Sequence, residues 1–390
     1  MQDKIRYIKR AFKGSARIIL LTLMPIACAT GDSEYAVGDD VRILDTQAHR
    51  VAVTVIADQL KHAWSVAELP DGSLLITEKE GRLRRVNPAT GTSEFIEGVP
   101  DSVKRGQGGL MDVRPHPGFD KNRWLYLTYS TTAGDAFATR AARARLENGR
   151  LEDIQVLFTA EPARASGRHF GADMVFDDDG YLYITSGERG SRPIIQDLSN
   201  HLGKIIRLHD DGRVPDDNPF VGVGGALPEV YSYGHRNPQG IAIEPVTGKL
   251  WSVEHGPRGG DELNLIEAGK NYGWPVITYG EEYRGGKIGE GTHKKGMEQP
   301  VHYYVPSIAT SGMAIYDGTA FPEWHGNAFI GALVKTHVNR LVLDNGRVVH
   351  EERLLEDWNL RIRDIEQAAD GSLYVLADNG PLLKLAPLDN

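Results

Sequence analysis

The sequence contains one cysteine, Cys28, among 390 residues. A single thiol cannot form an internal disulfide, so the buried core has to hold the fold. Helical periodicity is also scarce after residue 28, and no Gly-x-Gly-x-x-Gly motif follows a strand-like run and opens a helix. These absences favour an all-β chain and argue against a dinucleotide cofactor.

Positive charge is in deficit along most of the chain. The formal net charge is −9, from 44 basic and 53 acidic residues. Residues 1–28 hold six of the basic residues and one acidic residue, so the remainder carries a formal charge of −14. An acidic surface repels phosphate backbones, and no long basic stripe offsets it. We therefore expect no nucleic-acid partner.

The apolar run Ile18–Ala27 is too short to cross a bilayer comfortably. It follows a basic region and ends in small residues, a pattern typical of an export signal. The basic residues are Lys4, Arg6, Lys9, Arg10, Lys13 and Arg17. We predict that residues 1–28 are a signal peptide and that the mature protein is periplasmic or otherwise exported.

Cys28 follows Pro25-Ile26-Ala27, where a bacterial lipoprotein signal places its lipidated residue. This interpretation makes Cys28 the first mature residue and gives the protein a lipid anchor. Such a signal usually has leucine three residues before the cysteine, where this chain has Pro25. Cleavage after Ala29 is the alternative, and both interpretations predict export.

A short pattern recurs along the chain, a turn with Asp, Gly or Asn followed by alternating apolar residues. Its copies are Pro70–Ile76, Asp120–Leu127, Asp179–Ile184, Thr247–Val253, Gly326–Leu333 and Asp370–Leu376. Six such units predict an all-β, six-bladed propeller of four-stranded antiparallel blades over residues 51–390, after a linker at residues 29–50. A sandwich with coincidental hairpins is the alternative. Arg189–Glu229 and Ile277–Tyr304 are rich in Gly, Asp and Pro, which predicts long loops on one rim.

His169 and Glu188 flank one predicted hairpin, whose turn lies at Asp178-Asp179. They are about equally far from that turn, so an antiparallel pairing places both at the same end of the sheet. A carboxylate that orients an imidazole is what a general base near neutral pH requires. The alternative is a rim histidine with a solvated neighbour.

Four cationic residues, Arg236, Lys335, Arg361 and Arg363, come from different predicted blades but lie at strand ends or in strand-edge loops. Converging guanidinium and ammonium groups suit a small polyanion, because arginine can hold carboxylates bidentately. Scattered surface charges paired with nearby acids are the alternative.

Gly256-Pro257 and the run Gly259–Asn264 could gather a hard cation between backbone carbonyls and carboxylates. Their spacing does not match the helix-loop-helix calcium pattern. A plain glycine-rich turn is the alternative.

Five separated motifs together resemble the soluble quinoprotein glucose/sorbosone dehydrogenase family, and within it the bacterial aldose sugar dehydrogenases. The motifs lie at Gly106–Leu110, Arg168–Gly171, Tyr231–Gly240, Glu254–Pro257 and Arg361–Asp364. The resemblance extends from about Trp64 to Leu385. It implies oxidation of an aldose sugar at C1 to the lactone, with pyrroloquinoline quinone (PQQ) and Ca²⁺ as cofactors. Electrons would pass to an unidentified acceptor other than a nicotinamide.

The resemblance also implies residue roles. His169 would take the C1 hydroxyl proton while hydride passes to the quinone, Glu188 would orient His169, and Arg236 would stabilise the reduced quinone. The residues implied to hold PQQ are Gln107, Arg236, Asn237, Tyr283, Lys335, Arg361 and Arg363. The carbonyls of Gly256 and Pro257 would bind the calcium that touches PQQ. Glu262 and Tyr272 would serve a second, structural calcium.

The chain departs from the family near the base. Many members read His-x-Gly-x-Arg, whereas Asp173 occupies the fifth position here, so any salt bridge of that arginine is lost or rebuilt. Arg168 stands before the base, where glucose enzymes of the family have an acid, and its charge would lower the pKa of His169. The loop with Tyr283 looks shorter than in the glucose dehydrogenases, which would open the site to varied aldoses.

Two other functions fit the sequence. A calcium-dependent propeller lactonase would not need the cationic residues, and a non-catalytic binding propeller would not need His169. The sequence leaves the sugar, the electron acceptor and the choice between monomer and homodimer open.

Overall fold

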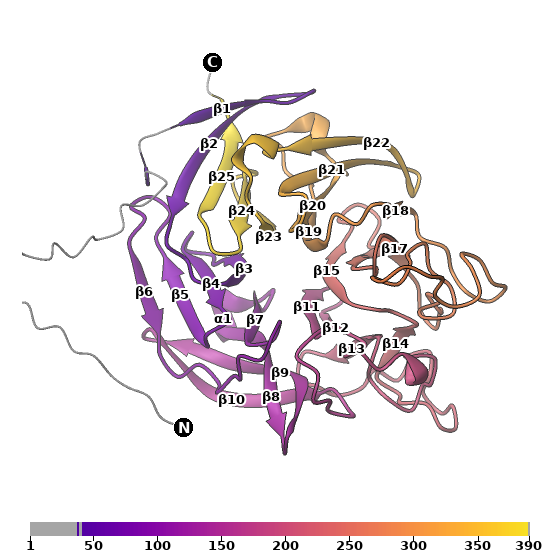
Figure 1. Cartoon of the computed structure of the whole chain (residues 1–390). Coiled ribbons are helices and arrows are strands. Elements are labelled where there is room, and N and C mark those ends of the chain that lie inside the picture. The colour runs from indigo at the N-terminus through magenta and orange to yellow at the C-terminus, as the bar shows by residue number, and fades with distance from the viewer. Residues whose placement is uncertain (1–36, 39–40, 389–390) are drawn as a thin grey trace, which may run out of the picture. The chain divides into compact units, whose positions relative to one another are not determined.

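The computed structural model describes residues 37–38 and 41–388, and these fold into six antiparallel sheets arranged around a centre (Figure 1). Each of the first three sheets uses four strands consecutive in the chain. Blade 1 contains β3 (Ala63–Glu68), β4 (Leu74–Glu78), β5 (Arg82–Val86) and β6 (Ser93–Ile96). Blade 2 contains β7 (Leu110–Pro115), β8 (Trp124–Ala133), β9 (Ala136–Glu147) and β10 (Arg150–Thr159), with α1 (Phe119–Asn122) between β7 and β8. Blade 3 contains β11 (Gly171–Phe176), β12 (Tyr181–Ser186), β13 (Lys204–His209) and β14 (Val230–Tyr233).

The remaining three sheets complete the ring. Blade 4 contains β15 (Pro238–Ile243), β16 (Leu250–Glu254), β17 (Asp261–Ile266) and β18 (His302–Tyr304). Blade 5 contains β19 (Thr310–Ile315), β20 (Ala328–Ala332), β21 (His337–Asp344) and β22 (Arg347–Leu354). Blade 6 contains β23 (Ile362–Gln367), β24 (Leu373–Ala377) and β25 (Leu382–Pro387), extended by β2 (Arg50–Ala57) and β1 (Arg42–Asp45). Short 3₁₀ turns lie at Arg192–Ile194, Pro322–Trp324 and Glu356–Trp358.

Blade 6 joins the two ends of the described chain. Strand β2 pairs antiparallel with β25, from Val51 opposite Pro387 to Ala57 opposite Leu382, and β1 adds a fifth strand. The prediction of six four-stranded blades is therefore confirmed, with one additional strand at Arg42–Asp45, inside the stretch for which we expect a linker. The predicted signal peptide and Cys28 lie outside the described residues.

Each of the six sequence repeats corresponds to the second strand of a blade: β4, β8, β12, β16, β20 or β24. These strands are buried on both faces because neighbouring blades stack against both. In β4, Leu75 packs into a cluster with Val113 of blade 2, whereas Leu74 and Ile76 pack into a cluster with Leu376 of blade 6. This stacking explains why the repeats are apolar at consecutive positions, which a two-sheet sandwich with solvated outer faces would not require.

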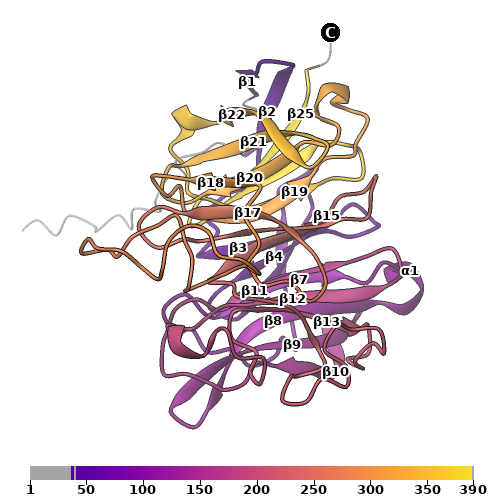
Figure 2. The ribbon, with the colours of Figure 1, turned by 90° about the vertical axis from the view of Figure 1, so that its right-hand side faces the viewer.

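The first strands lie nearest the centre of the ring (Figure 1). Three neighbouring pairs are hydrogen-bonded at matching positions, the third residue of one strand to the fourth of the next, as expected for strands that run in the same sense. Antiparallel alternation then places the starts of first strands and the ends of second strands at one end of the propeller, called here the site end. The loop 267–301 between β17 and β18 reaches that end, and Figure 2 shows it projecting away from the side that carries α1.

The expectation that Arg189–Glu229 is one rim loop is wrong. It contains β13, whose residues pair with β12 along its whole length, from Lys204 opposite Ser186 to His209 opposite Tyr181. Residues 187–203 therefore lie at the site end and residues 210–229 at the other.

None of the described helices is long and apolar enough to cross a membrane.

The first strand of every blade contains a register shift near its start. In three blades an aspartate at that shift forms a hydrogen bond with the next blade. The carboxylate of Asp112 accepts from Met174 N at 2.8 Å, that of Asp173 from Ile241 N at 2.8 Å, and that of Asp364 from Val66 N at 2.9 Å. Asp173, where many family members have arginine, also lies 3.5 Å from the guanidinium of Arg114. Asp173 therefore forms an ion pair with Arg114 of the neighbouring blade as well as the hydrogen bond to Ile241.

Replacing Asp173 by alanine should lower the free energy of unfolding by about 1–3 kcal/mol, because the buried N–H of Ile241 loses its acceptor. Urea unfolding followed by tryptophan fluorescence measures this loss. Asp120→Ala, on the exposed side of α1, is the control and should change stability by less than about 0.5 kcal/mol. Equal stabilities for the two variants would contradict the linking role of Asp173.

Candidate active site

The site end gathers polar residues from four blades. Gln107, His169, Arg236 and Arg361 each precede a first strand, and Glu188 follows the second strand of blade 3. The chain folds this way locally because glycines permit close approach. An ideal Cβ on Gly187 would lie 2.1 Å from the carbonyl oxygen of His169, so only glycine fits before Glu188.

The structure brings His169 and Glu188 into direct contact, as the equal distances from the hairpin turn predict. Nδ1 of His169 lies 2.5 Å from Oε1 of Glu188, and both side chains are buried. His169 has a left-handed backbone (φ 58°), and its N–H donates to Oε1 of Gln107 at 2.6 Å. Asn237 supports the same segment through its Oδ1, which accepts from Gly171 N at 3.1 Å. The imidazole is therefore held at Nδ1 and by its backbone, which leaves Nε2 for chemistry.

Burial is the largest effect on the pKa of His169 and holds it below the usual range, helped by the charges of Arg236 and Arg168. The hydrogen bond and charge of Glu188 act in the opposite direction. Burial alone would raise the pKa of Glu188, but the contact with His169 holds it below its ordinary value. His169 is thus neutral, and Glu188 ionised, at neutral pH.

Beside this pair lie two buried guanidinium groups that form no ion pair with a carboxylate of the described residues. Arg236 donates to the carbonyl of His255 at 2.9 Å and lies 5.3 Å from the Trp274 ring centroid. Arg363 donates to Oε1 of Gln239 at 3.2 Å and lies 4.3 Å from the ring of Trp64. Nε of each arginine is buried and has no hydrogen-bond partner in the part of the chain that the structure describes. Burial lowers the pKa of Arg363 to about 10, so the fold holds this charge at a cost.

The other predicted cofactor residues lie at the edge of this cluster. Arg361 is half exposed, donates to the carbonyl of Leu333 at 2.8 Å and lies 3.6 Å from Asp378. The hydroxyl of Tyr283 lies 3.5 Å from Nη2 of Arg236, and Tyr283 is 66% exposed. Lys335 is exposed at the end of β20, and no side-chain contact joins it to the other cations in the described part of the chain. After burial, the charges of Arg236, Arg363 and Arg361 lower the pKa of His255, so these three cations lie around one side chain.

The predicted metal residues divide between two hollows. Gly256, Glu262 and Tyr272 line a small cavity with Glu254, whereas Pro257 lines an adjoining groove of about 550 Å³ that also contacts Tyr283. Burial and the nearby charge of Glu254 raise the pKa of Glu262 well above its usual range. Residues 37–38 and 41–388 contain no group of three or more His, Cys, Asp or Glu side chains placed to hold a metal.

The small cavity nevertheless has features that a cation would satisfy. Oδ1 of Asn264, next to Glu262 and Glu254, is buried and has no partner within residues 37–38 and 41–388. The two carboxylates in this cavity also repel each other. The hydroxyl of Tyr272 donates to the carbonyl of Leu265 at 2.6 Å and accepts from Glu267 N, so it is already used within the fold. Tyr272 could therefore contribute only its carbonyl or its ring to such a site.

The chain matches a known enzyme family over most of its length. A family model described as glucose/sorbosone dehydrogenase matches residues 60–384. The chain belongs to this family. It is 45% identical over 345 residues to the aldose sugar dehydrogenase of Escherichia coli K12, with 86% of this chain and 93% of that protein covered. The family prediction from the sequence motifs is thus confirmed, and the chain is a member of an oxidoreductase family.

Solved structures of the same family share the fold. The apo-form of the soluble aldose sugar dehydrogenase from Escherichia coli has a TM-score of 0.84 and 44% identity, covering 87% of this chain and 100% of that one. The PQQ-bound form of the aldose sugar dehydrogenase from Streptomyces coelicolor has a TM-score of 0.73 and 28% identity, covering 86% and 98%. The resemblance includes the site end, because the matched segment contains all the predicted site residues.

The sequence analysis missed three residues at the site of this family member. His255 is half-buried, and its Nε2 lies 2.9 Å from Oε1 of Gln239. Desolvation and the charges of Arg236 and Arg363 hold its pKa well below the usual range. Trp64 and Lys79 lie beside Arg363, with the Lys79 ammonium 5.8 Å from the Trp64 ring centroid. Lys79 and His255 directly follow second strands, so the repeat pattern could have indicated both.

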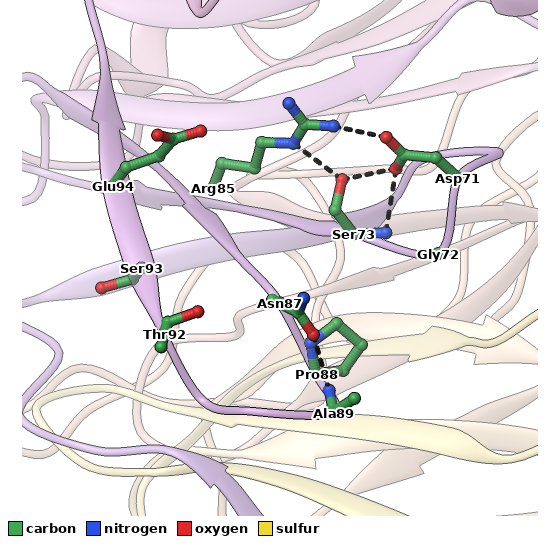
Figure 3. A pocket seen from close by; sticks show the side chains of 10 residues that line it. All are labelled: Asp71, Gly72, Ser73, Arg85, Asn87, Pro88, Ala89, Thr92, Ser93 and Glu94. Atoms are coloured by element: carbon green, nitrogen blue, oxygen red, sulfur yellow. Dashed lines mark hydrogen bonds and ion pairs between the residues drawn. The ribbon is translucent and has the colours of Figure 1, made fainter.

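A cavity of about 680 Å³ lies away from this site, at the turns 71–73 and 87–92 of blade 1 (Figure 3). Its one cation, Arg85, donates to Oγ of Ser73 at 2.9 Å and pairs with Asp71, as the dashed lines in Figure 3 show. Both turns join strands at the end opposite the site end. The cavity thus has a compensated charge and no connection with His169.

Replacing Glu188 by glutamine in this dehydrogenase should lower kcat by about 10²-fold and move the acid limb of kcat/KM to lower pH. Glutamine keeps an oxygen that can accept from Nδ1 but loses the charge that raises the pKa of His169. Since the base must be neutral, a lower pKa keeps it active at lower pH. A pH–rate profile of both proteins measures this shift, and a limb displaced to higher pH would contradict the assignment.

Proposed function

We propose that this protein oxidises aldose sugars at C1 to the lactone, with PQQ and Ca²⁺ as cofactors and a non-nicotinamide electron acceptor. The observation that carries the proposal is a neutral imidazole, held by Glu188, next to two buried guanidinium groups with unsatisfied N–H donors. A lactonase would have no use for that second feature. The Streptomyces coelicolor aldose sugar dehydrogenase shares the fold, and its structure was solved in the PQQ-bound form, which supports the choice of cofactor.

His169 would act as the general base. Its Nδ1–H donates to Glu188, so Nε2 carries the lone pair that takes the proton of the sugar C1 hydroxyl. The positive charge that develops on the ring is stabilised by the ionised carboxylate. The cofactor, when bound, supplies the two-electron acceptor for the hydride leaving C1. Arg236 and Arg363 would stabilise the negative charge that appears on the reduced acceptor.

The residues present fit an anionic quinone with several carboxylates. Arg363, Arg361 and Lys335 would bind carboxylates, and Arg236 would bind an oxygen of the quinone close to His169. Gln107, Asn237 and Tyr283 would contribute neutral hydrogen bonds. This arrangement explains why Nε of Arg236 and Nε of Arg363 have no hydrogen-bond partner among the described residues.

The residues around Gly256 also fit calcium, which takes oxygen ligands of mixed origin. The carbonyls of Gly256 and Pro257 would face the cofactor, and Glu262 with the carbonyl of Tyr272 would serve a second ion. Bound calcium would relieve the repulsion between Glu254 and Glu262.

We further propose that the protein is exported, either with a lipid on Cys28 or after cleavage behind Ala29, and works as a monomer or homodimer.

Dye-linked oxidation of an aldose panel by the purified protein tests the proposal. Activity should appear only when both PQQ and Ca²⁺ are added, and chelation of the metal should remove it. Lactone hydrolysis without PQQ would support a lactonase instead. No oxidation and no change in the quinone absorbance would support a binding propeller.

A further inference from the structure

Four arginines surround the segment that carries His169, and none has an ion pair within the described residues. They are Arg105, Arg164, Arg168 and Arg189. The chain as a whole is acidic, with a formal charge of −9, so a local group of unpaired cations does not follow from its overall composition. The acid that lies next to this group in sequence, Glu188, is already bonded to His169.

The buried member of the group, Arg189, orders the loop that carries Arg168. Nε of Arg189 donates to the carbonyl of Arg168 at 2.9 Å, Nη1 donates to the carbonyl of Phe137 at 2.9 Å, and Nη2 donates to that of Ser166. Its guanidinium stacks 3.5 Å from the ring centroid of Phe170. Because all three acceptors are carbonyls, Arg189 orders the loop before His169 without forming an ion pair within the described residues.

Two members are exposed to an incoming ligand. Arg168 is exposed and lies against Gly190, and its charge contributes to the low pKa of His169. Arg105 is exposed, with its guanidinium 5.6 Å from the Phe137 ring, and its segment packs against Gly167. Both therefore stand on the loops that also carry Gln107 and His169.

We propose that this arginine cluster selects aldoses that carry a carboxylate, the uronic acids. A neutral sugar needs hydrogen bonds but no uncompensated charge, whereas a carboxylate forms charge-assisted, bidentate bonds with arginine. A sugar whose C1 hydroxyl meets His169 places its other ring substituents against the adjoining residues, of which Arg168 is the nearest in the chain. An acidic protein partner would use the same charges, but it would not need them next to the base.

This inference rests on the proposed function, and the chemistry is unchanged. The C1–H bond breaks with transfer of hydride to the quinone, and the C1 hydroxyl proton passes to His169. The product is the lactone of the sugar acid, and the substrate carboxylate takes no part in the redox step. Its role is binding alone, so the cluster should change kcat/KM more than kcat.

The test compares glucuronate with glucose, which differ only at C6. We expect kcat/KM of the wild type to be at least tenfold higher for glucuronate than for glucose. This ratio should fall about tenfold in Arg168→Gln or in Arg105→Gln, because each variant loses one charge-assisted hydrogen bond to the carboxylate. Methyl glucuronide, which cannot be oxidised at C1, should inhibit more strongly than methyl glucoside, and added salt should weaken that inhibition.

Arg192→Gln is the matched control, because Arg192 lies in the neighbouring loop but is already paired with Glu282, Nη2 donating to Oε2 at 3.2 Å. Its substrate ratio should stay at the wild-type value. A wild-type ratio of one or less, or variants that slow both sugars equally, would overturn the inference. If the arginine variants changed the rate only with a protein electron acceptor, and not with a dye, the arginines would dock that protein and the inference would be wrong. If the wild type oxidised neither sugar, the proposed function itself would be refuted.

Discussion

Changing His169 to glutamine will lower kcat for sugar oxidation by about 10²–10⁴-fold while PQQ still binds. Glutamine keeps a polar side chain of similar reach, but it has no lone pair basic enough to take the C1 hydroxyl proton. The surroundings of position 169 are held by Gln107, Asn237 and Arg189 through backbone atoms, so the loop should keep its conformation. Steady-state kinetics and PQQ absorbance titration measure the two effects separately.

His201→Gln is the matched control for this prediction. His201 is also buried on blade 3 and bonded to a glutamate, with Nε2 2.7 Å from Oε1 of Glu229, but it makes no contact with Arg236 or Arg363. Its replacement should lower stability and leave kcat near the wild-type value. If both variants lost activity to the same extent, the loss would be structural and His169 would not be the base.

Changing Arg363 to methionine will weaken PQQ binding by about 10²-fold, which corresponds to about 3 kcal/mol for a buried charge-assisted hydrogen bond. The same change should not destabilise the PQQ-free protein. The lowered pKa of Arg363 means that the folded state disfavours the charged form, so a neutral side chain of similar length removes that cost. Fluorescence titration of PQQ and urea unfolding measure these two results.

Arg207→Met serves as the control for Arg363. Arg207 is similarly buried and stacks 3.8 Å from the ring of Tyr181, but its charge is compensated by Asp217, with Nη1 2.8 Å from Oδ1. We expect the control to lower stability and to leave PQQ affinity unchanged. Equal PQQ affinity of the Arg363 variant and the wild type would show that Arg363 does not hold the cofactor.

The sequence predicted the fold well because one strand of each blade has a distinctive signal. The second strands, such as β4 and β24, are buried on both faces and follow tight turns, so they appear as apolar runs after Gly or Asp. Strand β13 was missed because its flanks, residues 187–203 and 210–229, have loop composition. Strand β1 was missed because its four residues are mostly exposed, and only pairing with β2 makes them a strand.

The candidate site was predictable only where its geometry is local. His169 and Glu188 belong to one hairpin, so counting from the turn places them together, and the structure confirms that contact. The convergence of Arg236 with Arg363 depends on how blades 4 and 6 meet around the centre of the ring, which no spacing within one blade reveals. The same limit hid Trp64, which stacks on Arg363 from blade 1.

The role of this site is tested most directly by titrating PQQ into the calcium-supplemented, PQQ-free protein with an oxidisable aldose and a dye acceptor. We predict that activity rises linearly and stops rising at one PQQ per chain. His169→Gln should bind the same amount of PQQ and remain inactive. Activity that needs no PQQ, or a His169 variant as active as the wild type at saturating PQQ, would contradict the assignment of this site.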